Sequence, residues 1–425
     1  MDHLSDPGKF QAPELTESST LDDYLLYALA ANPALKASYH RWEAAVQQAP
    51  QAGALPNPRL GYGYFLRQVE TRVGPQVQRF GLSQAFPWFG KLSLAESKAA
   101  KAARAAGRKF EADRVELYRK VRVAYYDYWF LGRRIEITQS NLALLEQTEE
   151  IASNRYSTGS GGFSQLIKVQ VEMGKLEDGI ATLEDLATSH AAAFNALLGR
   201  DTGLPLPFPA AIDTTAVVQS PAELEQLLVE RNPELARLRE LQGSAEDGVR
   251  LAGKQRWPDV MVGLDYIQTD ESEMPNIADN GRDPLIASVS INLPLSFGKY
   301  EAAEKQAASR LGALRQQEMD MTNMLSARLK QAVVDLDDAD RKVDLYGSTL
   351  VPKAEQSLEA AITALSAGKA DALDVLDAQR TLLDFQLELE RSLAALAKSV
   401  AEIEALTGET LNIDRAAQAH PEGGN

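Results

Sequence analysis

The sequence predicts a mainly α-helical chain with two β-hairpins, and three observations support this fold class. The 425 residues read as two similar halves. Each half contains two short segments in which apolar and polar residues alternate, as in half-buried strands. Each pair of segments is followed by a very long stretch rich in strong helix formers. Each half therefore reads helix, hairpin, long helix, glycine turn and coiled-coil helix.

The internal repeat keeps an almost constant offset along the chain. Asn32-Pro33 returns as Asn232-Pro233, 232 − 32 = 200 positions later, and the offset grows only to 209 near the end of each half. The corresponding positions include Leu35 and Leu235, Gly63 and Gly263, Gly159 and Gly368, and Gly199 and Gly408. A period of about 200 is far longer than the repeat of a solenoid. We therefore predict two structural repeats.

The domain organisation follows from the repeat and from the prolines between the halves. We expect a disordered leader over 1–19, a first structural repeat over 20–204, an inter-repeat linker over 205–220, a second repeat over 221–411, and a flexible tail over 412–425. The repeats contain β-hairpins at 60–86 and 259–294 and long helical hairpins at 91–198 and 299–407.

The amino-acid composition limits which partners the protein can bind and which chemistry its side chains can perform. A net charge of −16 argues against nucleic acid or an anionic membrane surface as a partner. The absence of Cys excludes disulfides, thiolate metal sites and a cysteine nucleophile. No run approaches 18 apolar residues, so we expect no transmembrane helix. The first 19 residues contain no apolar signal segment, and we expect that the export signal either has been removed or is not included in this sequence.

The first helices are placed by their prolines. Leu21 to Ala31 predicts a short amphipathic helix that ends before Asn32-Pro33, because the residue before proline avoids the α region. A helix resumes over 34–49, and Pro50 is expected to break it together with the following Gly53, Pro56 and Pro58.

Alternation predicts four strands, at about 60–68, 76–86, 259–268 and 285–294. Leu60, Tyr62 and Tyr64 share one face of the first strand, as do Val262 and Leu264 in the second half. The loop from 269 to 284 is long and acidic, and we expect it to be solvated. Tyr62, Tyr64 and Tyr266 are candidates for an aromatic girdle, or are ordinary strand residues.

The helical hairpins show a coiled-coil pattern. The stretch from Lys91 to Ser153 would extend about 95 Å as one helix, at about 1.5 Å per residue. A glycine-rich turn ends it, and apolar residues then recur at spacings of three and four from Leu166 to Leu197. The second half keeps this register from Val375 to Leu406 but includes more serine. A cluster of five aromatic residues over 125–130 is expected to pack against neighbouring helices.

The strands point to a membrane because an isolated hairpin is marginal in water. Segments of about 9–11 residues with a two-residue period match lipid-spanning strands. A sheet in lipid must close, since each unpaired backbone group costs several kcal/mol. Four strands cannot close around a lumen, whereas several copies of the chain could. The long helices would then form a tube continuous with that barrel.

Two motifs add a family resemblance to this pattern. Phe86-Pro87-Trp88-Phe89-Gly90-Lys91 stands where the strands lead into the first long helix, and a second motif runs from Gly368 to Ala378. With the duplication and the two Asn-Pro pairs, the chain resembles the TolC-like outer-membrane efflux proteins of Gram-negative bacteria, over about Leu21 to Leu411. The first motif is most similar to members that serve RND-type pumps, including heavy-metal exporters.

The resemblance implies a trimeric channel. Its expected form is a homotrimer with a twelve-stranded transmembrane β-barrel, four strands per chain, and a long periplasmic α-helical barrel. It implies three partners: outer-membrane lipid, a periplasmic adaptor and an inner-membrane pump of the RND type. The implied function is efflux of small molecules or metal ions. Alternatives are a channel for type I protein secretion and a soluble coiled-coil scaffold. We find no convergent set of catalytic, cofactor or metal-binding residues and expect no enzyme.

Three acids after the second glycine turn are the candidate pore constriction. Asp374 and Asp377 lie three residues apart and share one helix face, with Asp371 close by. By themselves they are explained as acids that complement a helix dipole at its start. The resemblance instead implies rings of carboxylates, which constrict a pore and favour cations.

The two glycine turns are the candidate docking tips for the adaptor. They contain Gly159, Gly161 and Gly162 in the first half and Gly368 and Lys369 in the second. In the family a polar bridge between the two helical hairpins near the tips closes the entrance. The corresponding positions here are Leu365, Ala370, Ser164 and Gln165, which cannot form the usual charged or tyrosine bridges. We therefore expect any latch to use other groups.

Overall fold

The computed structural model describes residues 15–16, 18–212 and 219–408. The predicted tail and nearly all of the predicted leader lie outside these residues. The chain divides into two compact units, and each unit combines segments from both sequence halves. We call them the sheet unit (39–109 and 234–320) and the helical unit (1–38, 110–233 and 321–425). The division into two repeats by chain order thus stays a proposal.

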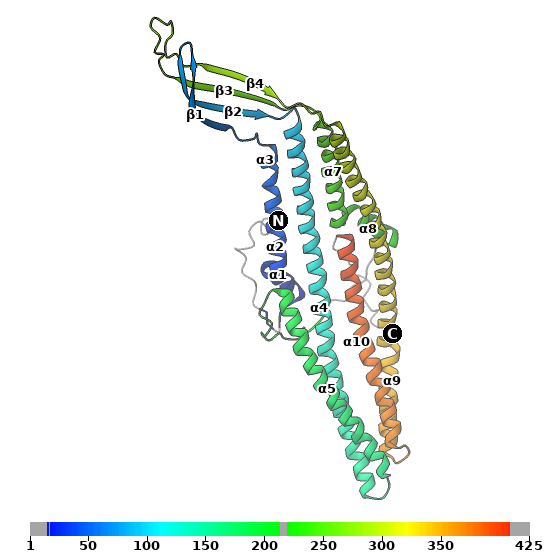
Figure 1. Ribbon diagram of the computed structural model, residues 1–425. Coiled ribbons are helices and arrows are strands. Elements are labelled where there is room, and N and C mark those ends of the chain that lie inside the picture. Colours follow the sequence, from blue (N-terminus) through cyan, green and yellow to red (C-terminus); the bar gives the residue numbers. More distant parts are fainter. Residues whose placement is uncertain (1–14, 17, 213–218, 409–425) are drawn as a thin grey trace. The chain divides into compact units, whose positions relative to one another are not determined.

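The sheet unit contains one antiparallel sheet with the strand order β1-β2-β3-β4 (Figure 1). The strands are β1 (Arg59–Thr71), β2 (Gly74–Phe86), β3 (Val260–Thr269) and β4 (Leu285–Ile291). All four predicted strands are confirmed, and the pairing of β2 with β3 joins the hairpins of the two halves. The last strand ends three residues earlier than predicted, shortly before Pro294, which has no N–H to donate to a ladder.

The register separates the sheet into an apolar face and a polar face. Leu60 pairs with Leu82, and Leu82 pairs with Leu264, so the predicted apolar positions lie side by side. The exposed apolar face holds Leu60, Tyr62, Phe80, Leu82, Val262, Leu264, Tyr266, Leu285, Val289 and Ile291. The polar face holds Gly61, Arg79, Gly81, Ser83, Gly263, Asp265, Ser288 and Ser290, with Met261 and Ile286 among them.

The predicted helix break at Pro50 is wrong. The chain forms α2 (Pro33–Val46) and then a separate short helix, α3 (Gln48–Gly53), that contains this proline. Pro50 occupies the first turn of α3, where a backbone N–H has no intrahelical partner in any case. The helix ends at Gly53, before the two following prolines.

Two long helices contribute to both units. They are α4 (Lys91–Ser157) and α8 (Phe297–Leu345). In the sheet unit both helices contact α7 (Pro233–Lys254): Lys101 on α4 pairs with Asp247 at 2.6 Å, and Arg239 pairs with Glu318 on α8 at 2.9 Å. These ion pairs fix the three helices side by side.

The motif from Phe86 to Lys91, at the end of β2, contacts residues of the second sequence half. The ring of Trp88 stacks on Trp257 with centroids 5.3 Å apart. The Lys91 ammonium donates to the Trp257 carbonyl at 2.9 Å and to Asp259 Oδ1 at 2.8 Å. The same carboxylate oxygen accepts the Trp88 N–H at 2.8 Å. The motif therefore fixes the start of α4 against the start of β3.

The helical unit is built from the two helical hairpins and the short helices between them. Its remaining elements are α1 (Leu21–Ala31), α5 (Phe163–Leu198), α6 (Pro221–Arg231), the π-helical turn η2 (Tyr346–Leu350), α9 (Val351–Ser366) and α10 (Ala372–Thr407). The heptad residues Leu166, Val169, Val375 and Leu382 are buried in one core cluster with Leu145. No helix within 18–212 and 219–408 is both long and apolar enough to cross a membrane.

The second long helix is not continuous, unlike the single helix that was expected. A π-helical turn separates α8 from α9, directly before Pro352. Proline lacks the N–H that would bond to Ser348 and its ring crowds that carbonyl. A locally wider turn accommodates the missing bond.

Each Asn-Pro pair performs the same task in its half. Asn32 Nδ2 donates to the Leu197 carbonyl at 2.8 Å, and Asn232 Nδ2 donates to the Leu406 carbonyl at 2.9 Å. Both carbonyls lie at the end of a returning helix, where backbone groups lack helical partners. The duplicated asparagines therefore fasten the short first helix of each half to the last helix of the same half.

The predicted packing of the aromatic cluster is confirmed. Tyr24 on α1 stacks on Phe194 of α5 and meets Tyr125 of α4 edge-on, with centroids 5.2 and 5.4 Å apart. Tyr128 stacks on Phe208 at 4.6 Å and donates its hydroxyl to the Leu206 carbonyl at 2.7 Å. Burial raises the pKa of Tyr24 to about 12, so the ring stays neutral. The cluster anchors α1 and the 205–212 segment on α4.

Candidate functional site

The two glycine turns have nearly identical local structure. Gly159 ends α4 and Gly368 ends α9, both with φ of 74°, in the left-handed region that favours glycine. No atom lies within 4 Å of the position where a side chain would start at either residue. Gly162 is equally open, whereas a side chain on Gly161 would start 3.0 Å from the Arg155 Cβ, so the first turn is open at two of its three glycines. Their role in docking stays a prediction, as does that of Gly161, Gly162 and Lys369.

A single arginine connects the two turns. Arg155 lies in the last turn of α4, and its Nη1 donates to the carbonyls of Leu365 and Ala370, both at 3.0 Å. These carbonyls belong to the C-terminal end of α9 and to the turn that follows. A cation at that position also complements the negative end of the helix dipole. Arg155 therefore links the first helical hairpin to the second at their turns.

Three of the four positions that correspond to the family's polar bridge contact the other hairpin here. Leu365 and Ala370 provide backbone carbonyls, as described above. Gln165 reaches Asp371 through its side chain, Nε2 to Oδ2, at 3.4 Å. The sequence does not reveal the role of Leu365 and Ala370, because their contacts with Arg155 are made by backbone carbonyls, which every residue has.

A stronger connection lies on the helices behind the turns. Arg380 on α10 binds Glu172 on α5 through two bonds, Nε to Oε1 at 3.1 Å and Nη2 to Oε2 at 2.6 Å. Lys175 adds a contact to the same carboxylate at 3.2 Å. The bond from Arg380 lowers the pKa of Glu172, and its bond to the carboxylate raises the pKa of Arg380. No sequence pattern indicates this pair, because both residues lie outside the predicted apolar seam.

The three candidate pore acids differ in their surroundings. Asp371 is the N-cap of α10, where its Oδ1 accepts the N–H of Leu373 at 2.8 Å. Asp374 closes the capping box by accepting the Asp371 N–H at 3.0 Å. Asp377 is free of such contacts, with 82% of its side chain exposed and only a loose approach of 3.9 Å to Arg380. Two acids thus start a helix, and Asp374 and Asp377 also lie on its exposed face.

A polar layer lies inside the helical unit, close to the Arg380–Glu172 pair. Gln379 donates to the Asn141 carbonyl at 2.5 Å, while Asn141 Oδ1 and Gln379 Oε1 are buried without a partner among the described residues. A void of about 10 Å³ adjoins both residues. A void of this size is close to the smallest that holds one water molecule, which could donate to both oxygens.

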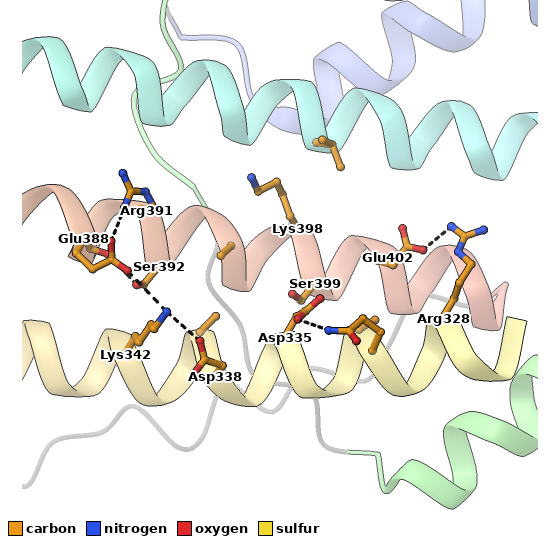
Figure 2. A pocket seen from close by; sticks show the side chains of 15 residues that line it. Arg328, Asp335, Asp338, Lys342, Glu388, Arg391, Ser392, Lys398, Ser399 and Glu402 are labelled. Atoms are coloured by element: carbon orange, nitrogen blue, oxygen red, sulfur yellow. Dashed lines mark hydrogen bonds and ion pairs between the residues drawn. The ribbon is translucent and has the colours of Figure 1, made fainter. Parts of the chain in front are cut away.

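A charged cleft of the helical unit lies between α8 and α10, with a volume of about 550 Å³ (Figure 2). Its cationic and acidic side chains balance one another, and they form ion pairs or hydrogen bonds with other side chains. The contacts are Arg328–Glu402, Lys342–Asp338, Arg391–Glu388, Lys398–Asp127 and Gln331–Asp335. The cleft therefore offers little free charge to a small ionic ligand. Within the described residues, no three His, Asp or Glu side chains are grouped to hold a metal ion.

Comparison with solved structures supports the fold. The chain is similar to the outer membrane protein VceC from Vibrio cholerae, with a TM-score of 0.75, 21% identity, and coverage of 92% of this chain and 96% of VceC. It is also similar to CusC, with a TM-score of 0.78, 16% identity and coverage of 94% and 99%. The open MtrE outer membrane channel of Neisseria gonorrhoeae gives a TM-score of 0.74, 17% identity and coverage of 92% and 89%.

Comparison of sequences identifies the family. A relative, the cobalt-zinc-cadmium resistance protein CzcC of Cupriavidus metallidurans, is 24% identical over 412 residues, which cover 95% of this chain and 94% of CzcC. The family model described as outer membrane efflux protein matches residues 26–200 and 224–409. These two matches cover most of both sequence halves, in agreement with the predicted resemblance. The chain therefore belongs to the outer membrane efflux protein family.

Proposed function

We propose that three copies of the chain form a duct across the outer membrane, through which an inner-membrane pump exports its substrate. The observation that best supports this proposal is the apolar face of the sheet. Leu60 and Val289 on that face are 81% and 73% exposed, and they have eight large apolar neighbours in similar positions. A soluble chain rarely exposes a continuous apolar area of this extent. Acyl chains of lipid would cover it.

Trimerisation provides the remaining backbone partners of the sheet. The strand order leaves one side of β1 and one side of β4 unpaired among the described residues. Such edges are not tolerated in lipid, where each open backbone group costs several kcal/mol. In the proposed assembly, β4 of one copy pairs with β1 of the next, and twelve strands close a barrel. The polar face, with its Arg79–Asp265 pair at 3.0 Å, then lines the lumen.

The helical hairpins form the periplasmic tube in this proposal, and the glycine turns are its adaptor-binding end. Gly159, Gly161 and Gly162 of one hairpin and Gly368 and Lys369 of the other provide the contact surface. Open space around the turns and the left-handed backbone support this assignment. An adaptor that binds there connects the duct to a pump of the RND type.

We assign metal cations as the substrate class, because the relative CzcC is named for resistance to cobalt, zinc and cadmium. The exposed acids Asp374 and Asp377 support this assignment. In a trimer they would form two rings of three carboxylates, with Asp371 close to the first. Rings of this kind attract cations and disfavour anions.

The proposed function is tested by the assembly and conductance of the purified chain. We expect a detergent-dependent trimer that inserts into planar bilayers and conducts ions. A monomeric particle that is stable in buffer without detergent would contradict the proposal, since the apolar face would then have no lipid to contact. Deletion of the gene should raise the metal sensitivity of the host, and re-expression should restore resistance.

A further inference from the structure

A second cleft, in the sheet unit, has an unusual charge for this acidic protein. It has a volume of about 690 Å³ and lies between the start of α4 and the start of α8. Four cationic side chains line it, Lys91, Lys98, Lys299 and Arg310, against the single acid Asp259. We propose that this cleft binds a small polyvalent anion of the phosphate class from solution.

The floor of the cleft is made by small residues of α7. Ser244, Ala245, Gly248 and Ala252 face it, and their short side chains leave a trough between the two flanking helices. A side chain on Gly248 would start 3.7 Å from the Lys98 Cε, so Lys98 lies directly beside this glycine. A ligand here reaches the helix backbone closely, as glycine permits.

Arg310 lies across the trough from Lys98. Gln242 on α7 contacts the Leu314 carbonyl of α8 at 3.5 Å, and Gly253 lies near Glu304, so the two helices are antiparallel. Interpolation between these two contacts places Arg310 at about the level of residues 246–247 on α7, within one helical turn of Gly248. Lys98 on α4 and Arg310 on α8 therefore line the same cleft near Gly248 from its two flanking helices. Guanidinium and ammonium groups together are suited to the oxygens of phosphate.

The cations differ in whether they are already neutralised. Lys91 is buried and its ammonium contacts the Asp259 carboxylate at 2.8 Å. Lys98, Lys299 and Arg310 are exposed and have no ion-pair partner among residues 18–212 and 219–408. In the cleft between α8 and α10, by contrast, every cation contacts an acid. Three cations without an ion-pair partner among the described residues thus line one cleft, although the whole chain has a net charge of −16.

The strand register indicates which side of the sheet the cleft adjoins. Asp259 and Asn292 line the cleft, and the Asn292 N–H donates to the Asp259 carbonyl at 3.3 Å, which continues the pairing of β3 with β4. By strand alternation both residues fall on the polar face, with Asp265 and Ser288. If that face lines the lumen, as in the proposed function, the anion comes from the lumen solution and not from lipid.

Calorimetric titration of the full-length protein in detergent with pyrophosphate tests the inference. We expect saturable binding with one site per chain. The double variant Lys98→Gln/Arg310→Gln should weaken it by about tenfold or more, as expected for two solvent-exposed charge contacts. The matched control is Lys305→Gln/Arg315→Gln. It removes the same charge from residues outside the cleft, which pair with Glu301 and Glu246, and should leave the affinity within about twofold.

A second variant separates shape from charge. Gly248→Leu fills the floor without changing any charge and should also abolish binding. The inference is overturned by three results: no binding to the unaltered protein, an equal loss in the control variant, or loss of bound pyrophosphate when phosphatidylglycerol is added to the micelles, which would make lipid the occupant. Calorimetry measures pyrophosphate binding whether or not the protein conducts ions. A failure of the proposed duct would appear in the bilayer experiment and would be distinguished from a failure of this inference.

Discussion

Arg380 of α10 and Glu172 of α5 are joined by two hydrogen bonds, with the shorter at 2.6 Å. The pair connects the returning helices of the two helical hairpins, which are separated by most of the second half in sequence. The core cluster that holds these helices is apolar, whereas this link is ionic, with the Arg380 side chain half exposed and the Glu172 side chain only 15% exposed. We propose that this pair acts as a gate between the two hairpins, because breaking it separates two charged groups and not two apolar surfaces.

Replacement of Arg380 by Gln should favour the open channel. It leaves Glu172 with Lys175, a contact within α5 that no longer joins the two hairpins. An exposed ion pair contributes up to about 1 kcal/mol, which corresponds to up to about a fivefold change in the ratio of closed to open channels. Single-channel recording in planar bilayers measures this ratio. The control Arg341→Gln removes a pair that lies within one helix and should leave gating unchanged.

Acid should have the same effect as that substitution. The pKa of Glu172 is lowered below its usual 4.5, chiefly by the bond from Arg380. The stabilisation by the pair is complete above the unfolded value of 4.5 and is lost as the pH falls through the lower folded value. Open probability should therefore be constant above pH 4.5 and rise below it. An Arg380→Gln channel should lack the part of this rise that comes from the pair.

Arg155 should control the mobility of the second turn. In Arg155→Gln, the carbonyls of Leu365 and Ala370 lose their shared donor. We expect faster hydrogen exchange at the Lys369 and Ala370 amides, both of which bond to the Ala364 carbonyl. Exchange in the core helix around Val375 should not change. Equal exchange in the variant and the unaltered protein would show that the turn is held without Arg155.

The local pattern predicted the elements but not the contacts between distant segments. The alternation of apolar and polar residues predicted both hairpins, because successive residues of a strand lie on opposite faces of the sheet. The Asn-Pro pairs marked helix ends for the same local reason. The Arg380–Glu172 pair and the carbonyls bound by Arg155 depend on how α5, α9 and α10 pack, and no spacing in the sequence encodes that. The helix through Pro50 was missed because proline is harmful only beyond the first turn.

The glycines that end α9 and α10 should differ in their tolerance of alanine. Gly368 and Gly408 both have a left-handed backbone, which costs a residue with a side chain about 1–2 kcal/mol. A side chain on Gly408 would also start 3.0 Å from the Arg231 carbonyl, whereas Gly368 has no neighbour within 4 Å. Thermal unfolding should therefore show Gly408→Ala to be less stable than Gly368→Ala, by about 1 kcal/mol or more. If both variants lose the same free energy of unfolding, the Arg231 carbonyl must move away from the new side chain without an energetic cost.

Removal of the exposed acids of α10 should reduce cation selectivity. Asp374→Asn/Asp377→Asn would remove six charges from the proposed trimer while Asp371 remains as the helix cap. Charges on neighbouring chains in a narrow lumen repel one another and attract cations, because interactions at a few ångströms are worth about 4 kcal/mol at an intermediate dielectric. The reversal potential in a salt gradient should shift toward zero, and block by divalent cations should weaken.

A charge-matched control decides whether this effect is local. Glu355→Gln/Glu359→Gln removes the same number of exposed charges from α9, on the same helical hairpin. If Asp374 and Asp377 line the constriction, the control channel should keep its selectivity and its divalent block, since charges outside the narrow region are screened by salt. Equal shifts in the two double variants would instead mean that only net charge matters. The two aspartates would then be helix-start acids that face water.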